Sequence, residues 1–109
     1  MHKIEDLIVW KKAIQLTKEV YLLSAKIPND EKFGIISQIK RCSVSIPSNI
    51  AEGAARNSNN EFKHFLGIAN RSCYQLQTQL ILIKELNLTN EIIEIDLLID
   101  KCIEIQKMI

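Results

Sequence analysis

Apolar residues recur every three or four positions along four stretches of the chain, and short polar segments separate these stretches. This spacing gathers apolar side chains on one face of an α-helix. It predicts helices over residues 6–26, 31–56, 59–86 and 91–109. No stretch alternates apolar and polar residues as a half-buried strand does. Connections of about two to five residues join antiparallel neighbours, so the pattern predicts an all-α, up-down-up-down four-helix bundle that forms one domain over residues 1–109.

Capping residues and helix breakers mark the expected helix boundaries. Ser58 and Glu61 have the spacing of a capping box, in which each side chain bonds to the backbone N–H of the other. Pro28 stops the first helix, and Asn87 suits the left-handed conformation that ends the third. The other expected N-caps are Asp6 for the first helix, Asn29 or Asp30 for the second, and Thr89 or Asn90 for the fourth.

The second predicted helix carries a proline in its interior, at Pro47. A proline there removes one backbone donor and clashes with the carbonyl four residues earlier, at a cost of about 3 kcal/mol. Its small polar neighbours, Ser43, Ser45, Ser48 and Asn49, have side chains that bond a freed carbonyl. We therefore expect a kink at Pro47. The bend either fits the helix around its neighbours or, together with the polar turn after it, forms a binding surface.

The fourth predicted helix is apolar on more than one face. One stripe consists of Ile92, Ile95, Ile99, Cys102, Ile103 and Ile109, and the other of Ile93, Leu97, Leu98, Ile105 and Met108. A helix in a small monomeric bundle needs only one apolar face. The second stripe therefore predicts an interface with another copy of the chain.

The composition narrows the classes of function. Only 3 Gly and 2 Pro occur, which favours few, long elements. The net charge is +1, so binding to nucleic acid requires local clustering of the basic residues. Cys42, Cys73 and Cys102 fall at apolar helical positions, which favours a place in the core. Their odd number and the lack of a secretory leader pattern favour a reducing cytoplasm. No apolar run approaches the roughly 20 residues of a membrane span.

The sequence offers no convincing catalytic or metal site. Glu61 and His64 have the spacing that places two metal ligands on one helix face, but a di-iron bundle needs a second such pair. The only other histidine is His2. Glu52 is the one carboxylate worth following as a general base, although pairing with Arg56 or exposure to solvent explains it more simply. We expect no enzyme activity, no metal and no cofactor.

Basic residues cluster near the proline segment and on the third helix. They are Lys40, Arg41, Arg56, Lys63 and Arg71. If the chain assembles as a ring, each basic patch is repeated around it, and the combined field favours a phosphate backbone. The alternative is a solvated helix exterior.

A larger set of residues gives the chain a family resemblance. It comprises Leu7, Val9, Trp10, Ala13, Val20, Tyr21, Pro28, Glu31, Phe33, Gly34, Gln38, Lys40, Arg41, the run SIPSNIAEG at 45–53, Phe62, Phe65, Leu66, Ile68, Ala69, Ser72, Leu76, Thr78, Gln79 and Leu80. The run at 45–53 is the most specific part. On these residues the chain resembles the bacterial four-helix bundle proteins first noticed as reading frames within intervening sequences of the large-subunit ribosomal RNA gene. Accessory proteins of diversity-generating retroelements belong to the same group.

The resemblance implies a non-enzymatic bundle that assembles as a homopentamer, with nucleic-acid binding on basic surfaces. In the retroelement branch it also implies binding of a reverse transcriptase. Arg71 replaces a glycine common in the family, and Gln75 and Gln77 replace common acidic residues, which favours a polyanion such as structured RNA or DNA. The net charge of +1 differs from the strongly basic retroelement accessories and favours the general branch. A protein-interaction scaffold or adaptor with no direct nucleic-acid role is the alternative function.

Overall fold

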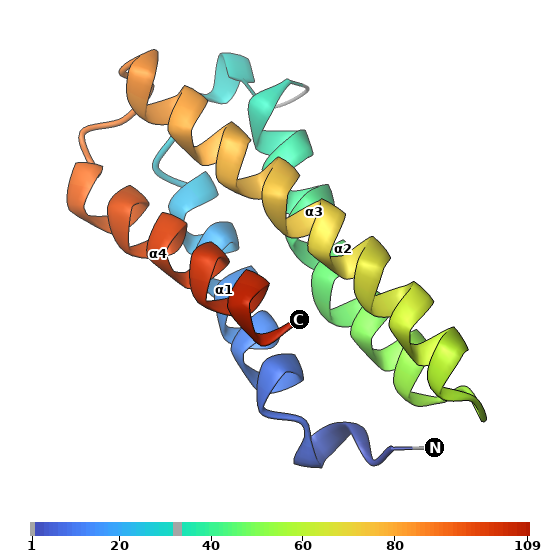
Figure 1. Ribbon diagram of the computed structural model, residues 1–109. Helices are drawn as coiled ribbons and strands as arrows, with labels where there is room; N and C mark the ends of the chain where they lie inside the picture. Colours follow the sequence, from blue (N-terminus) through green and yellow to red (C-terminus); the bar gives the residue numbers. More distant parts are fainter. Residues whose placement is uncertain (1, 32–33) are drawn as a thin grey trace.

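Four α-helices run alternately up and down and pack as a bundle (Figure 1). The structure, a computed structural model, describes residues 2–31 and 34–109. The helices are α1 (Ile8–Ser24), α2 (Ile35–Ala54), α3 (Asn59–Glu85) and α4 (Ile92–Met108), and 3-10 turns occur at Ile4–Asp6 and Asn29–Glu31. Each helix packs against the next one along the chain, and α4 also packs against α1. No strand occurs in the two described ranges, and the predicted all-α four-helix bundle is confirmed.

The core lies along the axis of the bundle and is almost entirely aliphatic. Its buried members are Ala13, Leu16, Val20, Leu23, Ile27, Ile36, Ile39, Cys42, Ile46, Ile50, Ala69, Cys73, Leu76, Leu80, Ile83, Ile95, Leu98, Cys102 and Ile105. They recur at three-and-four spacing on all four helices, as the pattern predicted. All three cysteines are among them as free thiols, which confirms their expected place in the core.

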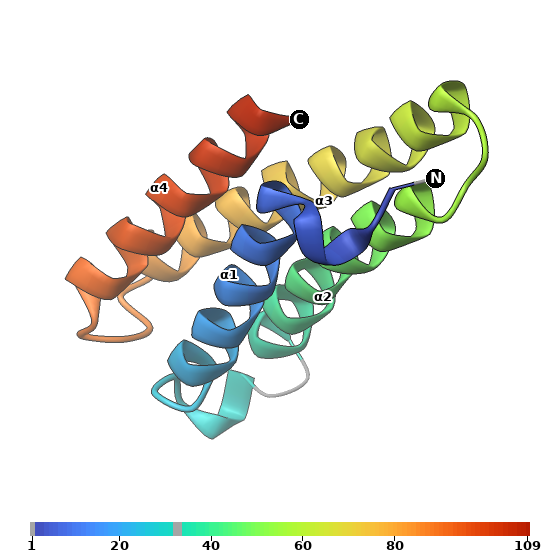
Figure 2. The ribbon, with the colours of Figure 1, turned by 90° about the horizontal axis from the view of Figure 1, so that it is seen from below.

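α2 and α3 form a hairpin whose connected ends extend beyond the end of α4 (Figure 1). The N-terminal segment before α1 crosses toward this end of the hairpin (Figure 2). There the backbone N–H of His2 donates to the carbonyl of Ala54 at 2.9 Å. The His2 ring packs on Phe62, with 4.6 Å between the ring centroids. The hairpin tip is thus anchored by residues far away in the sequence.

The boundaries of α3 follow the predicted caps. The backbone N–H of Glu61 donates to the Ser58 hydroxyl at 3.1 Å, which is one of the two bonds of the predicted capping box. Asn87, just beyond the helix, has φ = 52°, the left-handed conformation predicted there. This turn lets the Leu88 backbone N–H donate to the Ile83 carbonyl at 3.1 Å, so a group without a helical partner is satisfied at each end of α3.

The caps predicted for α1 and α2 are wrong, because those residues lie in 3-10 turns and other residues occupy the N-cap positions. Asp6 closes a 3-10 turn, and the N-cap of α1 is Leu7. Asn29 and Asp30 lie in the second 3-10 turn, while α2 begins only after Gly34. Phe33, which carries part of the family resemblance, lies outside the described residues.

Neither residue expected to cap α4 occupies the N-cap position. That position is held by Glu91, which makes no side-chain capping bond. The Thr89 hydroxyl accepts from the Glu91 backbone N–H at 3.3 Å, and Asn90 lies between the two. The connection is therefore braced by Thr89 before the helix starts.

α2 continues without interruption through Pro47, and a side chain of α1 lies against the carbonyl that Pro47 leaves without a helical donor. Proline lacks the N–H that would bond to the Ser43 carbonyl four residues earlier. The hydroxyl of Thr17, on α1, lies 2.8 Å from this carbonyl and 2.9 Å from the Ala13 carbonyl of its own helix, so the two acceptors share its single proton. Pro47 itself is buried, which favours the interpretation that it fits the helix to its neighbours. The expected kink stays a prediction.

The polar residues near Pro47 have other partners than the ones expected. Ser43 donates to the Lys40 carbonyl at 2.9 Å, and Asn49 donates to the Ser45 carbonyl at 2.8 Å. The Ser45 hydroxyl bonds across to the Ser72 hydroxyl on α3 at 2.8 Å. The prediction that these residues bond the carbonyl freed by Pro47 is therefore wrong. Ser45 contacts α3 instead, and Asn49 braces Ser45 from the same helix.

Candidate nucleic-acid interface

Charge is distributed unevenly over the bundle. Between residues 35 and 85 the chain has six Lys and Arg against three Asp and Glu, and between 88 and 109 it has two against five. The α2–α3 hairpin is therefore net positive, and the segment containing α4 is net negative. Any polyanion that approaches the bundle is attracted to the hairpin side.

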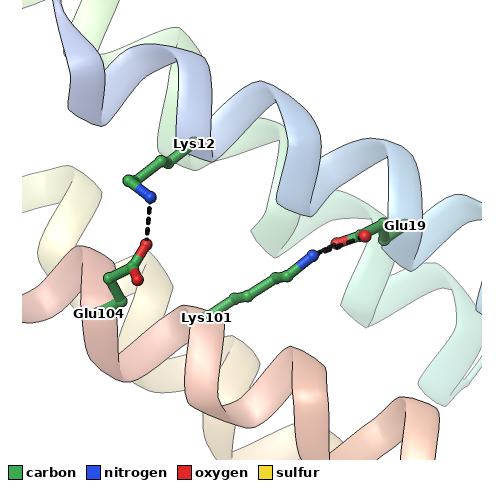
Figure 3. A network of polar contacts seen from close by, with 4 residues as sticks. All are labelled: Lys12, Glu19, Lys101 and Glu104. Carbon is green, nitrogen blue, oxygen red and sulfur yellow. Dashed lines mark hydrogen bonds and ion pairs between the residues drawn. The ribbon is translucent and has the colours of Figure 1, made fainter.

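Ion pairs bind the acidic α4 to its neighbours. Between α1 and α4, Lys12 contacts Glu104 at 2.7 Å, and Lys101 pairs with Glu19 (Figure 3). The remaining pairs of α4 are Lys26–Glu94 at 3.0 Å and Lys84–Asp96 at 2.8 Å. The side chains are partly exposed, so these pairs add little stability. They do neutralise the lysines that face α4.

Two of the five predicted basic residues are engaged within the chain. The Lys40 ammonium lies 5.0 Å from the centroid of the Tyr21 ring, on the side of α2 that faces α1. Arg56 contacts Glu52 at 2.6 Å and lies over the Phe65 ring at 4.9 Å. The expected pairing of Glu52 with Arg56 is confirmed. Both cations are less available to a ligand than their sequence positions indicated.

Arg41, Lys63 and Arg71 are exposed, and none makes an ion pair with another described residue. Arg41 precedes Cys42, whose thiol donates to Gln75 on α3 at 3.6 Å. Arg71 lies one turn before Gln75 on α3. The two arginines therefore flank one stretch of the α2–α3 seam. Lys63 lies two turns nearer the start of α3, so the five residues do not form a single cluster.

The apolar stripe predicted on α4 as an oligomer interface is wrong at two positions. Leu98 and Ile105 are 2% and 1% exposed, because they lie on the inner face of α4. Together with Ile95 and Cys102, they follow the three-and-four spacing of a core stripe. Ile93, Leu97 and Met108 are exposed, with Ile93 at 79%. These three residues remain as the exposed apolar stripe of α4.

The described residues contain no group of three or more side chains that could hold a metal ion. Among them, no helix is long and apolar enough to cross a membrane.

The histidine and cysteine side chains pack against other residues of the chain. The ring of His64 packs edge-on against the ring of Phe65, with 5.2 Å between the ring centroids. Hydrogen bonding with Cys73 and burial raise the pKa of the Cys102 thiol above its usual range. This thiol stays protonated at neutral pH, which makes it a poor nucleophile.

Sequence reasoning missed one exposed aromatic residue in this region. Tyr74, on the outer face of α3, is 56% exposed. Its position three residues after Arg71 was the available signal, because such a spacing places two side chains on the same face of a helix.

The chain is similar to known proteins over nearly its whole length. The family model of the 23S rRNA-intervening sequence protein matches residues 5–109. Among solved structures, the chain is similar to the crystal structure of a protein of unknown function from the S23 ribosomal protein family of Bacteroides thetaiotaomicron VPI-5482. The two sequences are 26% identical, and their folds agree with a TM-score of 0.80 over 93% of this chain and 94% of the other. Among curated proteins, none matches. The resemblance inferred from SIPSNIAEG and its flanking residues is confirmed, and the chain belongs to the 23S rRNA-intervening sequence protein family.

Proposed function

We propose that this protein is a non-enzymatic, homo-oligomeric bundle that binds the phosphate backbone of RNA or DNA through the outer face of its α2–α3 hairpin. The supporting observation is the pair of exposed arginines, Arg41 and Arg71, which have no ion-pair partner in the described part of the chain. A guanidinium group presents paired donors that match a phosphate. Lys63 extends the positive surface toward the hairpin tip. The free buried thiols fit a reducing cytoplasm.

Replacing Arg41 and Arg71 together with alanine is expected to weaken RNA binding about tenfold or more at low salt, because two phosphate contacts are lost. A gel-shift titration with a structured RNA measures this change. The matched control is the double variant Lys11→Ala with Lys18→Ala, which removes the same charge from exposed positions on α1. Equal losses in both double variants would show a nonspecific effect of net charge, and unchanged binding in the arginine variant would refute this surface.

Self-association is the second part of the proposed function, and the exposed stripe on α4 supports it. Ile93, Leu97 and Met108 are large apolar residues whose spacing places them on one face of α4. They are exposed, and other residues of α4 form its part of the core, so this face is free to contact another copy. The family resemblance implies a pentameric ring. Such a ring would repeat the arginines of each copy around its surface. A modest charge per chain then produces a strong local field.

Changing Ile93 and Leu97 to glutamate is expected to convert the oligomer to a monomer, because buried charges would oppose contact between copies. Gel filtration with light scattering gives the mass of each species. The control carries the same changes at Ile81 and Leu82, two exposed apolar residues of α3 that are 40% and 44% exposed. A wild-type protein that is monomeric at micromolar concentration would contradict the proposal, as would an oligomer that persists in the α4 variant.

A scaffold that binds another protein, such as a reverse transcriptase, is the alternative. The observation in its favour is that further large apolar residues are exposed away from the α4 stripe, among them Ile8, Leu22 and Leu86. This function requires no salt-sensitive binding of nucleic acid. A gene location beside a reverse transcriptase gene would favour it, and a location inside a ribosomal RNA gene would favour the general branch of the family.

A further inference from the structure

A shallow hollow lies on the outer surface of α3, in the same region as the two free arginines. Its volume is about 280 Å³, and it is lined by Tyr74, Gln75, Thr78 and Gln79. The Thr78 hydroxyl donates to the Tyr74 carbonyl at 3.0 Å, so it is satisfied within its own helix. The ring of Tyr74 and the two glutamine side chains, which bond only to the Cys42 sulfur, are the remaining groups that could meet a ligand.

Tyr74 differs from the only other tyrosine, Tyr21, in its surroundings. Tyr21 is 45% exposed, and the Lys40 ammonium lies over its ring. Tyr74 is 56% exposed, and no cation or aromatic ring covers it among the residues that the structure describes. An exposed ring of this kind offers a flat surface on which a planar group can stack.

The glutamines beside Tyr74 are incompletely hydrogen bonded. The Gln79 amide donates to the Cys42 sulfur at 3.4 Å, but its Oε1 is buried and accepts no hydrogen bond. Buried polar atoms without a partner are uncommon and call for an explanation. The Gln75 Oε1 accepts from the Cys42 thiol, a weak donor. Because this oxygen is buried, a ligand with N–H donors reaches it only when the Gln79 side chain turns outward and gives up its weak bond to the Cys42 sulfur.

The arginines supply the charge that complements a phosphate. Arg71 lies one turn before Tyr74 on the exposed side of α3, and Arg41 follows the same seam on α2, next to Cys42. An exposed ring, two glutamine side chains and Arg71 thus occur on neighbouring turns of α3, and Arg41 lies across the seam on α2. This is the combination that binds unpaired nucleotides: the aromatic ring stacks on a base, and the cations hold the backbone.

We propose that the hollow at Tyr74 binds an unpaired base of single-stranded RNA or DNA. The base stacks on the Tyr74 ring, its edge meets the amides of Gln75 and Gln79, and Arg41 and Arg71 contact the flanking phosphates. A base inside a duplex is already stacked and paired, so it cannot enter the hollow. This inference rests on the proposed function and specifies its ligand as a single strand.

The test compares a fluorescent single-stranded oligonucleotide with a duplex of the same sequence, using anisotropy at constant salt. Tyr74→Ala is expected to weaken binding of the single strand about tenfold, as the loss of one stacked base does, and to leave binding of the duplex unchanged. Tyr74→Phe keeps the stacking ring and should retain most of the affinity. Tyr21→Ala is the matched control and should have no effect, because Tyr21 lies on another face under Lys40.

Each other outcome has a distinct meaning. Unchanged single-strand binding by Tyr74→Ala, or an equal loss on the duplex, would overturn the base-binding site while leaving the proposed function in place. A change in the mass of the oligomer on Tyr74→Ala would show that a second copy covers this face, which also overturns the inference. If the wild-type protein bound neither oligonucleotide, the proposed function itself would fail.

Discussion

Replacing Gly53 with alanine is expected to lower the free energy of unfolding by roughly 1–3 kcal/mol, the usual effect of overpacking. A Cβ at Gly53 would lie 2.9 Å from Phe62 Cδ1, 2.9 Å from Phe65 Cβ and 3.2 Å from the Phe62 carbonyl oxygen. The Phe65 Cβ and the carbonyl belong to or adjoin the backbone of α3, so they move only if the helix moves. The α2–α3 hairpin therefore depends on the absence of a side chain at position 53.

Gly67 provides the matched control, because it lies in α3 and a Cβ added there would meet no other atom within 4 Å. Gly67→Ala should stabilise the protein by about 0.5–1 kcal/mol, since alanine is the better helix former. Urea unfolding followed by circular dichroism measures both variants. An increase in stability for Gly53→Ala similar to that for Gly67→Ala would show that the close approach of the two helices is unimportant.

The second large effect concerns the carbonyl that Pro47 leaves without a helical partner. Thr17→Val removes the hydroxyl that the Ser43 and Ala13 carbonyls share, and it should cost about 1–3 kcal/mol. The Ala13 carbonyl keeps its backbone bond within α1, whereas the Ser43 carbonyl has no helical donor because residue 47 is proline. In a Pro47→Ala background the backbone N–H at position 47 reaches the same carbonyl, so the cost of Thr17→Val should shrink. The double-mutant cycle, measured by urea unfolding, gives the coupling between positions 17 and 47.

Thr78→Val is the control for this cycle, because the Thr78 hydroxyl bonds a carbonyl of its own helix at an exposed position. Thr78→Val should change the free energy of unfolding little, and this change should be the same with proline or alanine at position 47. If the costs of Thr17→Val and Pro47→Ala were simply additive, the hydroxyl of Thr17 would not be the substitute for the missing donor.

The helices could be predicted from the sequence because their signals are local. The three-and-four spacing needs only a window of one or two helical turns, and the Ser58 cap and the left-handed Asn87 depend on adjacent residues. The failures occurred where the signal is not local. The donor to the Ser43 carbonyl comes from Thr17, 26 residues away, and nothing near Pro47 indicates it.

The candidate site was only partly predictable for the same reason. The sequence identifies a cation but not its neighbours, so the contacts of Lys40 with Tyr21 and of Arg56 with Phe65 could not be anticipated. α4 presents a different difficulty, since it is rich in isoleucine and leucine on most of its circumference. Its inner and outer faces cannot be separated without the packing partners, which is why the pattern places Leu98 on the outer stripe although it is buried.

The salt dependence of RNA binding tests the proposed phosphate-binding surface most directly. A plot of the logarithm of the association constant against the logarithm of the salt concentration should fall linearly, by about 0.7–0.9 for each phosphate that the protein neutralises. In the variant lacking Arg41 and Arg71, the slope should become shallower by roughly 1.4–1.8, because two phosphate contacts are lost. The control variant lacking Lys11 and Lys18 should keep the wild-type slope. Binding that does not respond to salt, or an arginine variant with the wild-type slope, would contradict the proposal.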